Sequence, residues 1–244
     1  VSNNTIKNDG REWALFSQVL EKWQANKSFD LVTKEFLIGG KETTILFVDG
    51  FIKDEVFAKM MDFMMKITPR EMGDIAGVQE FIKRFVPYVE VTAKEEPDEI
   101  LTDILSGNTG MFVEGFRQCI LVDSRTYPQR SIQEPDKDKV LRGSHEGFVE
   151  TVVFNTALIR RRLRDPHLTM EITKVGRRSQ TDVVLCYLDN QVDKRLLRKI
   201  REKLQNLRIN SLTMTMQSLA EVLVDTKWFN PLPKVCYDSA HLLL

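Results

Sequence analysis

Residues 43–67 read TTILFVDGFIKDEVFAKMMDFMMKI, and residues 183–207 read VVLCYLDNQVDKRLLRKIREKLQNL. The two stretches align without a gap when Asp189 is set over Asp49, and their apolar positions coincide along most of the length. Each begins with the closely spaced apolar residues of a strand and continues with apolar residues at helical spacing. Repetition of one strand–helix unit predicts two related lobes. Chance agreement between two generic units is the alternative.

A second strand is expected before each repeated stretch. Residues 31–38 precede Gly39 and Gly40, and residues 168–175 precede a turn that begins at Gly176. Glycine tolerates the positive φ angles of tight turns, so both pairs of strands are predicted to form hairpins. A helix over 53–67 is expected to pack on the first hairpin through Val56, Met60, Phe63, Met64 and Ile67. In the second copy Leu196 aligns with Val56, on a helix over 193–207.

The remaining apolar spacing predicts further elements and a fold class. In chain order these are a helix over 12–25, a loop over 69–74, a helix over 78–85, a strand over 88–92, a helix over 97–105, strands over 111–113 and 116–122, and a helix over 146–163. The fold class is therefore α/β of the mixed α+β kind. We expect two related mixed-sheet α/β lobes, each with a strand hairpin followed by a packed helix, plus an N-terminal helix.

Four segments follow from this pattern. They are an N-terminal extension with an amphipathic helix (1–30), a first α/β lobe (31–125), an Arg/Pro-rich linker (126–145) and a second α/β lobe (146–244). After its last predicted helix, over 97–105, the first copy continues into the predicted hairpin over 111–122. In the second copy the equivalent helix would begin only at residues 240–244. The second lobe is therefore expected to be incomplete at its C-terminus.

Composition argues against several functional classes. The 244 residues carry 35 Lys and Arg and 35 Asp and Glu, so no global field favours nucleic acid as a partner. No apolar run approaches the roughly 18 residues of a membrane span, and residues 1–10 lack the features of a secretory signal. Three widely separated cysteines suggest neither a disulfide framework nor a metal site. The chain is expected to be soluble as given.

No catalytic constellation is visible in the sequence. His145, His167 and His241 lack partners at metal-binding spacing, and the adjacent Ser144, His145 and Glu146 cannot supply the spatial arrangement of a triad. The glycine motifs of dinucleotide-binding folds and of α/β-hydrolases are missing. We therefore expect a non-enzyme, with no catalytic, cofactor-binding or metal-binding residues.

Charge is nevertheless uneven along the chain. Between Arg125 and Arg178 there are twelve Lys or Arg against seven Asp or Glu. Arginine suits carboxylate and phosphate partners, so this stretch could contact another subunit or pair with its own acidic residues to lock the linker. Both interpretations stay open. The candidate inter-lobe or partner interface consists of Arg130, Glu134, Pro135, Arg142, Gly143, Glu146, Arg160, Arg161 and Arg162.

Three motifs in this stretch resemble a known family. They are PQRSIQEP at 128–135, VLRGSHEGFVE at 140–150 and NTALIRRRL at 155–163, and VGRRSQT at 175–181 continues the likeness. Their order and spacing resemble the signature of the GerA family of spore germination proteins. That family often has Pro-Arg where this chain has Ser144 and His145, which puts the role of that arginine in doubt here.

The resemblance implies a function and partners. It implies the soluble N-terminal region of a germinant receptor A subunit, on the cytoplasmic side of the spore inner membrane, which a C-terminal region absent from this chain would span. The implied partners are the receptor B and C subunits and other A subunits. The expected role is a scaffold that supports receptor assembly and the triggering of germination, without cofactors. The alternative is a module that binds a small nutrient in a cleft between the lobes.

Overall fold

The computed structural model describes residues 14–52, 54–86, 90–125, 148, 151–176, 178, 180–206 and 242–243. The chain forms two compact units and passes between them more than once. The first unit comprises Val1–Ala25, Leu31–Tyr127 and Arg160–Pro166, and the second comprises Asn26–Asp30, Pro128–Ile159 and His167–Leu244.

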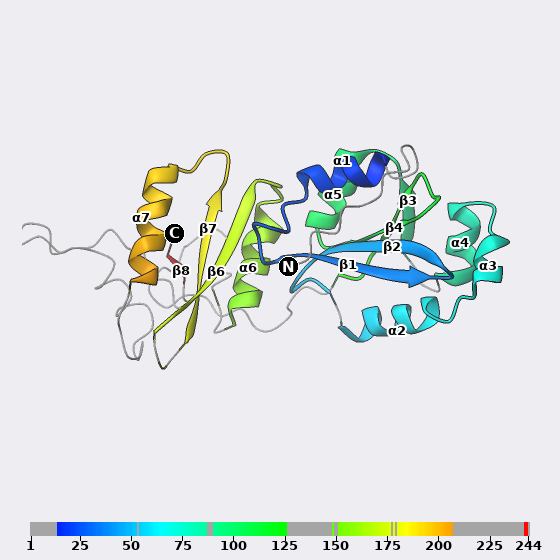
Figure 1. Ribbon diagram of the computed structural model, residues 1–244, viewed down its shortest axis with the longest axis horizontal. Helices are drawn as coiled ribbons and strands as arrows, with labels where there is room; N and C mark the ends of the chain where they lie inside the picture. The colour runs from blue at the N-terminus through cyan, green and yellow to red at the C-terminus, as the bar shows by residue number, and fades with distance from the viewer. Residues whose placement is uncertain are drawn as a thin grey trace, which may run out of the picture. The chain divides into compact units, whose positions relative to one another are not determined.

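An antiparallel five-stranded sheet organises the first unit, with the strand order β1-β2-β4-β5-β3 (Figure 1). The strands are β1 (Leu31–Ile38), β2 (Lys41–Val48), β3 (Val91–Lys94), β4 (Thr109–Val113) and β5 (Cys119–Val122). Successive side chains of a strand point to opposite faces of the sheet. Cross-strand pairing therefore places Ile45, Met111 and Ile120 in one row, and this row lies in a buried apolar cluster.

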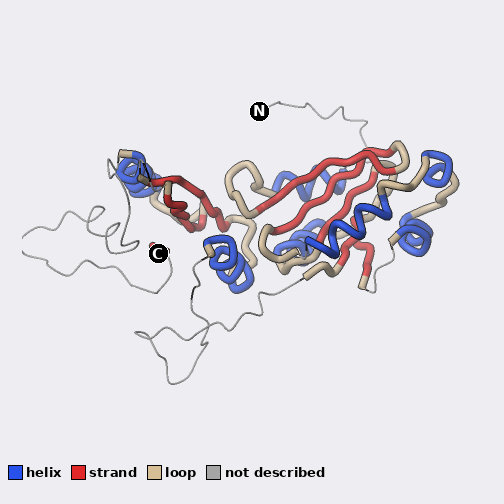
Figure 2. Tube along the Cα trace, turned by 90° about the horizontal axis from the view of Figure 1, so that it is seen from below, coloured by secondary structure: helices blue, strands red, loops and turns tan. Residues whose placement is uncertain are grey.

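Helices cover both faces of this sheet (Figures 1 and 2). Residues of α2 (Asp54–Met64), α3 (Pro69–Gly73) and α4 (Val78–Phe85) pack in the cluster that holds Ile45. On the other face lie α1 (Ala14–Lys22) and α5 (Pro97–Leu105), where the rings of Phe16 and Phe112 are 5.1 Å apart. A Cβ at Gly110 would lie 2.5 Å from Cδ1 of Ile104, so glycine allows α5 to approach β4 closely.

The second unit is smaller and centres on one hairpin. Strands β6 (Leu168–Val175) and β7 (Thr181–Leu188) pair antiparallel along their full length, and β8 (Leu242–Leu243) pairs with β7 in parallel. Helix α7 (Lys194–Gln205) packs through Leu197 and Leu204 on the face that carries Leu185. Helix α6 (Val152–Arg162) contributes Val152 and Ile159 to the apolar cluster on the other face of the hairpin.

The sequence repeat reappears in the packing of the two units. Five aligned pairs occupy the same kind of place in the two helix-on-hairpin cores: Ile45 and Leu185, Phe47 and Tyr187, Phe57 and Leu197, Met60 and Ile200, and Met64 and Leu204. The turns after the second strands also match, because the N–H of Phe51 donates to Val48 O and that of Gln191 donates to Leu188 O. The predicted α/β class, with a hairpin and a packed helix in each unit, is confirmed.

The inward face predicted for the helix over 53–67 is confirmed at Met60, Met64 and Ile67, whereas one apolar residue of each repeated helix that was expected to pack inward lies in solvent. Phe63 is 61% exposed, and Leu196 is 55% exposed. Phe57 and Leu197 pack inward instead. Adjacent helical residues point about 100° apart, so a face assigned one position too early leaves one apolar side chain in solvent.

Several element boundaries were also predicted wrongly. The loop expected over 69–74 contains α3, because Thr68 and Glu71 form a reciprocal capping box and Pro69 stands at the start of the helix. The strand expected over 116–122 begins at Cys119, since Phe116 closes a turn by donating to Val113 O. The helix expected over 146–163 begins at Val152, and the strand expected over 88–92 runs over Val91–Lys94.

Candidate functional site

Three of the nine residues of the predicted Arg-rich interface lie in the described part of the chain. Arg130, Glu134, Pro135, Arg142, Gly143 and Glu146 lie outside the described residues. The other three predicted residues end α6. Arg160 is fully buried and its Nη1 donates to the backbone oxygen of Asp165 at 3.1 Å, which stabilises the bend that follows the helix. Arg161 is half-buried and Arg162 is exposed, so Arg162 is the member of the three best placed to meet a partner.

In the described part of the chain, no group of three His, Cys, Asp or Glu side chains could hold a metal ion. Burial raises the pKa of the Cys119 thiol well above its usual range, so this cysteine stays protonated and is a poor nucleophile. Across the same residues, no helix combines the length and apolar character needed to cross a bilayer.

Helix α7 carries the densest positive charge among the described elements. Its twelve residues, KRLLRKIREKLQ, contain six Lys or Arg and one Glu. Leu197 and Leu204 are buried against the hairpin, whereas most of the charged side chains are exposed. An open surface depression lies along the helix. It is lined by Asp193, Arg195, Leu196, Arg198, Lys199 and Glu202.

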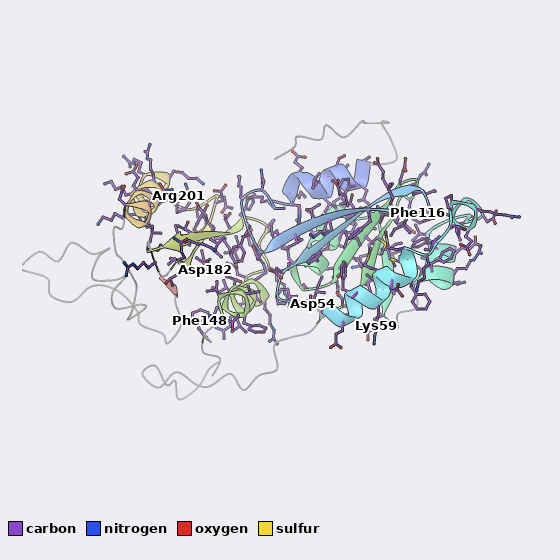
Figure 3. The ribbon with its side chains drawn as sticks, turned by 60° about the horizontal axis from the view of Figure 1, so that its bottom comes forward. Asp54, Lys59, Phe116, Phe148, Asp182 and Arg201 are labelled. Carbon is purple, nitrogen blue, oxygen red and sulfur yellow. The ribbon has the colours of Figure 1, made fainter. Side chains whose placement is uncertain are left out.

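A polar cluster around Arg201, which is labelled in Figure 3, attaches α7 to its hairpin. The Nε of Arg201 donates to Oε1 of Glu171 at 3.0 Å, and its Nη2 donates to Oε2 of Glu171 at 2.8 Å and to the Tyr187 hydroxyl at 3.0 Å. The hydrogen bonds with Glu171 raise the pKa of Arg201, and burial raises the pKa of Tyr187. This two-point contact between planar groups orients the helix as well as attaching it.

The aligned positions of the first unit are different. Lys34, Phe47 and Met61 stand where the second unit has Glu171, Tyr187 and Arg201. Met61 is buried in the first unit, so an apolar contact there corresponds to the polar cluster here. The second unit therefore holds its helix by direction-specific bonds while leaving the opposite side of that helix charged and exposed.

The segment Asn26–Asp30 completes the second unit from far away in the sequence. The N–H of Phe29 donates to Met170 O at 3.0 Å, and the N–H of Met170 donates to the buried Oγ of Ser28 at 2.8 Å. Lys27 Nζ lies 3.1 Å from Oδ2 of Asp189, and Oδ1 of the same carboxylate accepts a hydrogen bond from Lys194 at the start of α7. This segment thus joins strand β6 to the beginning of α7.

Acidification is expected to weaken the contacts of Asp189. Hydrogen bonds from Lys194 and Lys27 lower the pKa of this carboxyl in the folded chain. A lowered folded pKa gives stabilisation that is complete above the unfolded value of about 4 and is lost as pH falls through the folded pKa. Asp189→Asn should therefore reduce the free energy of unfolding by at most about 1 kcal/mol at pH 7. The difference from wild type should vanish below the folded pKa, in urea unfolding curves measured over pH.

Asp182→Asn is the matched control for this titration. Asp182 is an exposed aspartate of β7 (Figure 3). Its variant is expected to follow the wild-type curve throughout the pH range. A difference between Asp189→Asn and wild type that stays constant down to pH values well below 4 would mean that the carboxylate charge is not what stabilises the segment.

A solved structure shares the fold of this chain. The chain resembles the N-terminal domain of the A subunit of the Bacillus megaterium spore germinant receptor GerK3, with a TM-score of 0.61. The match covers 87% of this chain and 79% of that one, at 22% sequence identity. At this identity the likeness establishes the fold.

Curated relatives point to spore proteins. The chain is 32% identical over 212 residues to stage V sporulation protein AF of Bacillus subtilis, which covers 87% of this chain and 43% of the relative. It is 24% identical to spore germination protein KA of Bacillus subtilis, and that match covers 89% of this chain and 40% of the relative. It is 26% identical to spore germination protein GerLA of Bacillus cereus, and that match covers 84% of this chain and 42% of the relative. The chain thus spans about two fifths of the length of these relatives.

The family model for the Bacillus/Clostridium GerA spore germination protein matches residues 18–239. That range includes the three motifs at 128–163 on which the sequence resemblance rests, and the repeated hairpin–helix units on either side of them. Since it extends over most of the chain, this protein belongs to the GerA family of spore germination proteins.

Proposed function

We propose that this chain is the N-terminal region of a germinant receptor A subunit, acting as a scaffold for receptor assembly and for the triggering of germination. The observation that carries the proposal is the family match over residues 18–239. The fold likeness to the N-terminal domain of an A subunit supports the same assignment.

The proposed setting is the spore inner membrane. One relative, 26% identical over 86% of this chain, is named the membrane protein YfkQ of Bacillus subtilis, and the chain covers 40% of its length. On this proposal a further region of the protein spans the membrane and the present region lies on its cytoplasmic side. Its partners are the receptor B and C subunits and other A subunits.

Charge reversal in the Arg-rich stretch tests this role. The variant Arg162→Glu, at an exposed position, is expected to slow nutrient-triggered germination at least about tenfold if the arginine forms a charge-assisted contact with a partner subunit. Germination is measured as the loss of optical density of spores that carry the full-length variant. Exposed Arg117→Glu, in the first unit, makes the same change of charge and is expected to germinate at the wild-type rate.

Two other results would contradict this scaffold role. If Arg162→Glu unfolds the isolated chain at lower urea than wild type, the arginine acts within the fold and not at an interface. If calorimetric titration of the chain with nutrient amino acids or sugars gives saturable heat, the nutrient-binding alternative is favoured instead.

A second candidate function comes from the identities of the relatives. The 32% identity to stage V sporulation protein AF exceeds the 24% and 26% identities to the germination proteins KA and GerLA. A role in forming the spore is therefore the competing proposal. Deletion of the gene separates the two: a loss of heat-resistant spore yield favours the sporulation role, whereas normal spores that respond slowly to nutrients favour the receptor role.

A further inference from the structure

We propose that the exposed basic side of α7 binds the anionic headgroups of a phospholipid membrane. This surface, the α7 face, consists of Arg195, Leu196, Arg198, Lys199 and Glu202. The proposal rests on the proposed function, because that function places the chain next to a membrane. It adds a specific contact surface and the chemistry of its ligand.

The geometry of the helix gathers these charges into one stripe. Arg195, Arg198, Lys199 and Glu202 follow the spacing i, i+3, i+4 and i+7, which brings them to one side of an α-helix. Leu197 and Leu204 lie on the opposite side and are buried against the hairpin. The stripe therefore faces away from the sheet. Three cations and one carboxylate leave it with a net positive charge.

The chain uses other basic residues of α7 internally, but not those at the centre of the stripe. Lys194 forms an ion pair with Asp189, and Arg201 forms an ion pair with Glu171. Arg195 is 84% exposed at its side chain and its nearest carboxylate oxygen is 3.8 Å away, which is a weak surface contact. In the part of the chain that the structure describes, neither Arg198 nor Lys199 has a carboxylate within ion-pair distance.

A headgroup layer suits this surface better than a protein partner does. Stable protein interfaces bury an apolar core, and the α7 face offers a single apolar side chain, Leu196. Attraction to an anionic bilayer needs no shape complementarity and amounts to about a fivefold gain in binding for each basic residue. Leu196 lies at the flank of the stripe and is 55% exposed, so it can enter the boundary between headgroups and acyl chains.

The anchoring of α7 makes the surface ready for binding. Because Arg201 holds Glu171 and Tyr187 by directed hydrogen bonds, the helix is already folded and oriented before it meets a membrane. Its helix content should not rise on binding. The whole chain carries no net charge, so any attraction to an anionic surface must come from a local concentration of charge such as this one.

The test uses the 244-residue chain and vesicles that are roughly one-third phosphatidylglycerol in phosphatidylcholine, with pure phosphatidylcholine vesicles as the neutral arm. Binding is measured by co-sedimentation at low and at high salt. Wild type should bind the anionic vesicles, release them at high salt and ignore the neutral ones. The double variant Arg198→Glu with Lys199→Glu should bind at least about 30-fold more weakly.

A control variant separates the α7 face from total charge. Lys34→Glu with Lys59→Glu makes the same change in net charge at exposed positions of β1 and α2. Lys59 is labelled in Figure 3. It should keep its vesicle binding within about threefold of wild type, because those residues lie outside the proposed surface. Circular dichroism should report the same helix content for all three chains.

Three results would overturn the proposal: no binding of wild type to the anionic vesicles, equal losses in the two double variants, or binding that high salt does not weaken. Wild type that ignores vesicles, combined with loss of receptor assembly in full-length Arg198→Glu/Lys199→Glu, would assign the surface to an acidic protein partner. Because the vesicle assay contains only lipid, these failures leave the proposed germination role standing, and that role fails on the spore assays instead.

Discussion

Replacing Gly39 by alanine is expected to lower the free energy of unfolding of the first unit by about 2–5 kcal/mol. Gly39 has a φ of +56°, which costs a residue with a Cβ about 1–2 kcal/mol. An added Cβ would also lie 2.6 Å from Cβ of Met72 and 3.3 Å from Cγ2 of Ile67. The first of these atoms is fixed to the backbone of α3, so the clash cannot be relieved by a rotamer change alone.

Gly40→Ala provides the matched control for Gly39. Its φ of +79° imposes similar backbone strain, but the nearest atom to an added Cβ is Cγ of Pro69 at 3.6 Å, an ordinary contact. Gly40→Ala should therefore lower the free energy of unfolding by only about 1–2 kcal/mol. Urea unfolding followed by hydrogen exchange of the β1–β2 peptides measures both variants. Equal losses in the two variants would show that the Gly39–Met72 approach adds no constraint.

Replacing Leu197 by alanine is expected to destabilise the second unit by about 2–5 kcal/mol. Leu197 is 4% exposed and packs with Leu185 and Leu204, so truncation removes buried apolar surface and leaves a cavity. Few other buried apolar residues share this core, which limits its capacity to close over the gap. The measurement is urea unfolding followed by hydrogen exchange of β6 and β7 peptides.

The neighbouring Leu196 provides the matched control for Leu197→Ala. Leu196 is 55% exposed, and Leu196→Ala should change the free energy of unfolding by no more than about 0.5 kcal/mol. The two variants make the same chemical change one residue apart on one helix. If Leu196→Ala were the more damaging, α7 would pack through Leu196, as its alignment with Val56 predicted, and the α7 face would not be available for binding.

Much of the architecture follows from short-range patterns in the sequence. Closely spaced apolar residues and glycine placement predicted the two repeated hairpins, and apolar residues at helical spacing predicted the helix after each. These signals are local, because each depends on the periodicity of one element. The helix α3 was missed although Thr68, Pro69 and Glu71 carry its capping signal, since a helix of five residues is too short to show an apolar period.

The candidate binding surfaces were harder to predict from the sequence than the hairpins and helices. The charge count drew attention to residues 125–178, where Arg160 is buried inside the fold. The basic residues of α7 at 194–203 are evident in the sequence, but which of them are exposed depends on which side of the helix packs against the hairpin. A helix with leucines at 196, 197 and 204 offers more than one apolar face, and a shift of one position turns the covered face by about 100° and so changes which charges are exposed.

The sequence by itself determined the two hairpin–helix units and, through the motifs at 128–163, the family, because these depend on residues close together in the chain. Only the tertiary structure decided which of Leu196 and Leu197 is buried. The inclusion of Asn26–Asp30 in the second unit was decided in the same way. Both outcomes depend on contacts between distant residues, such as Phe29 with Met170 and Lys27 with Asp189, whose pairing no local period records.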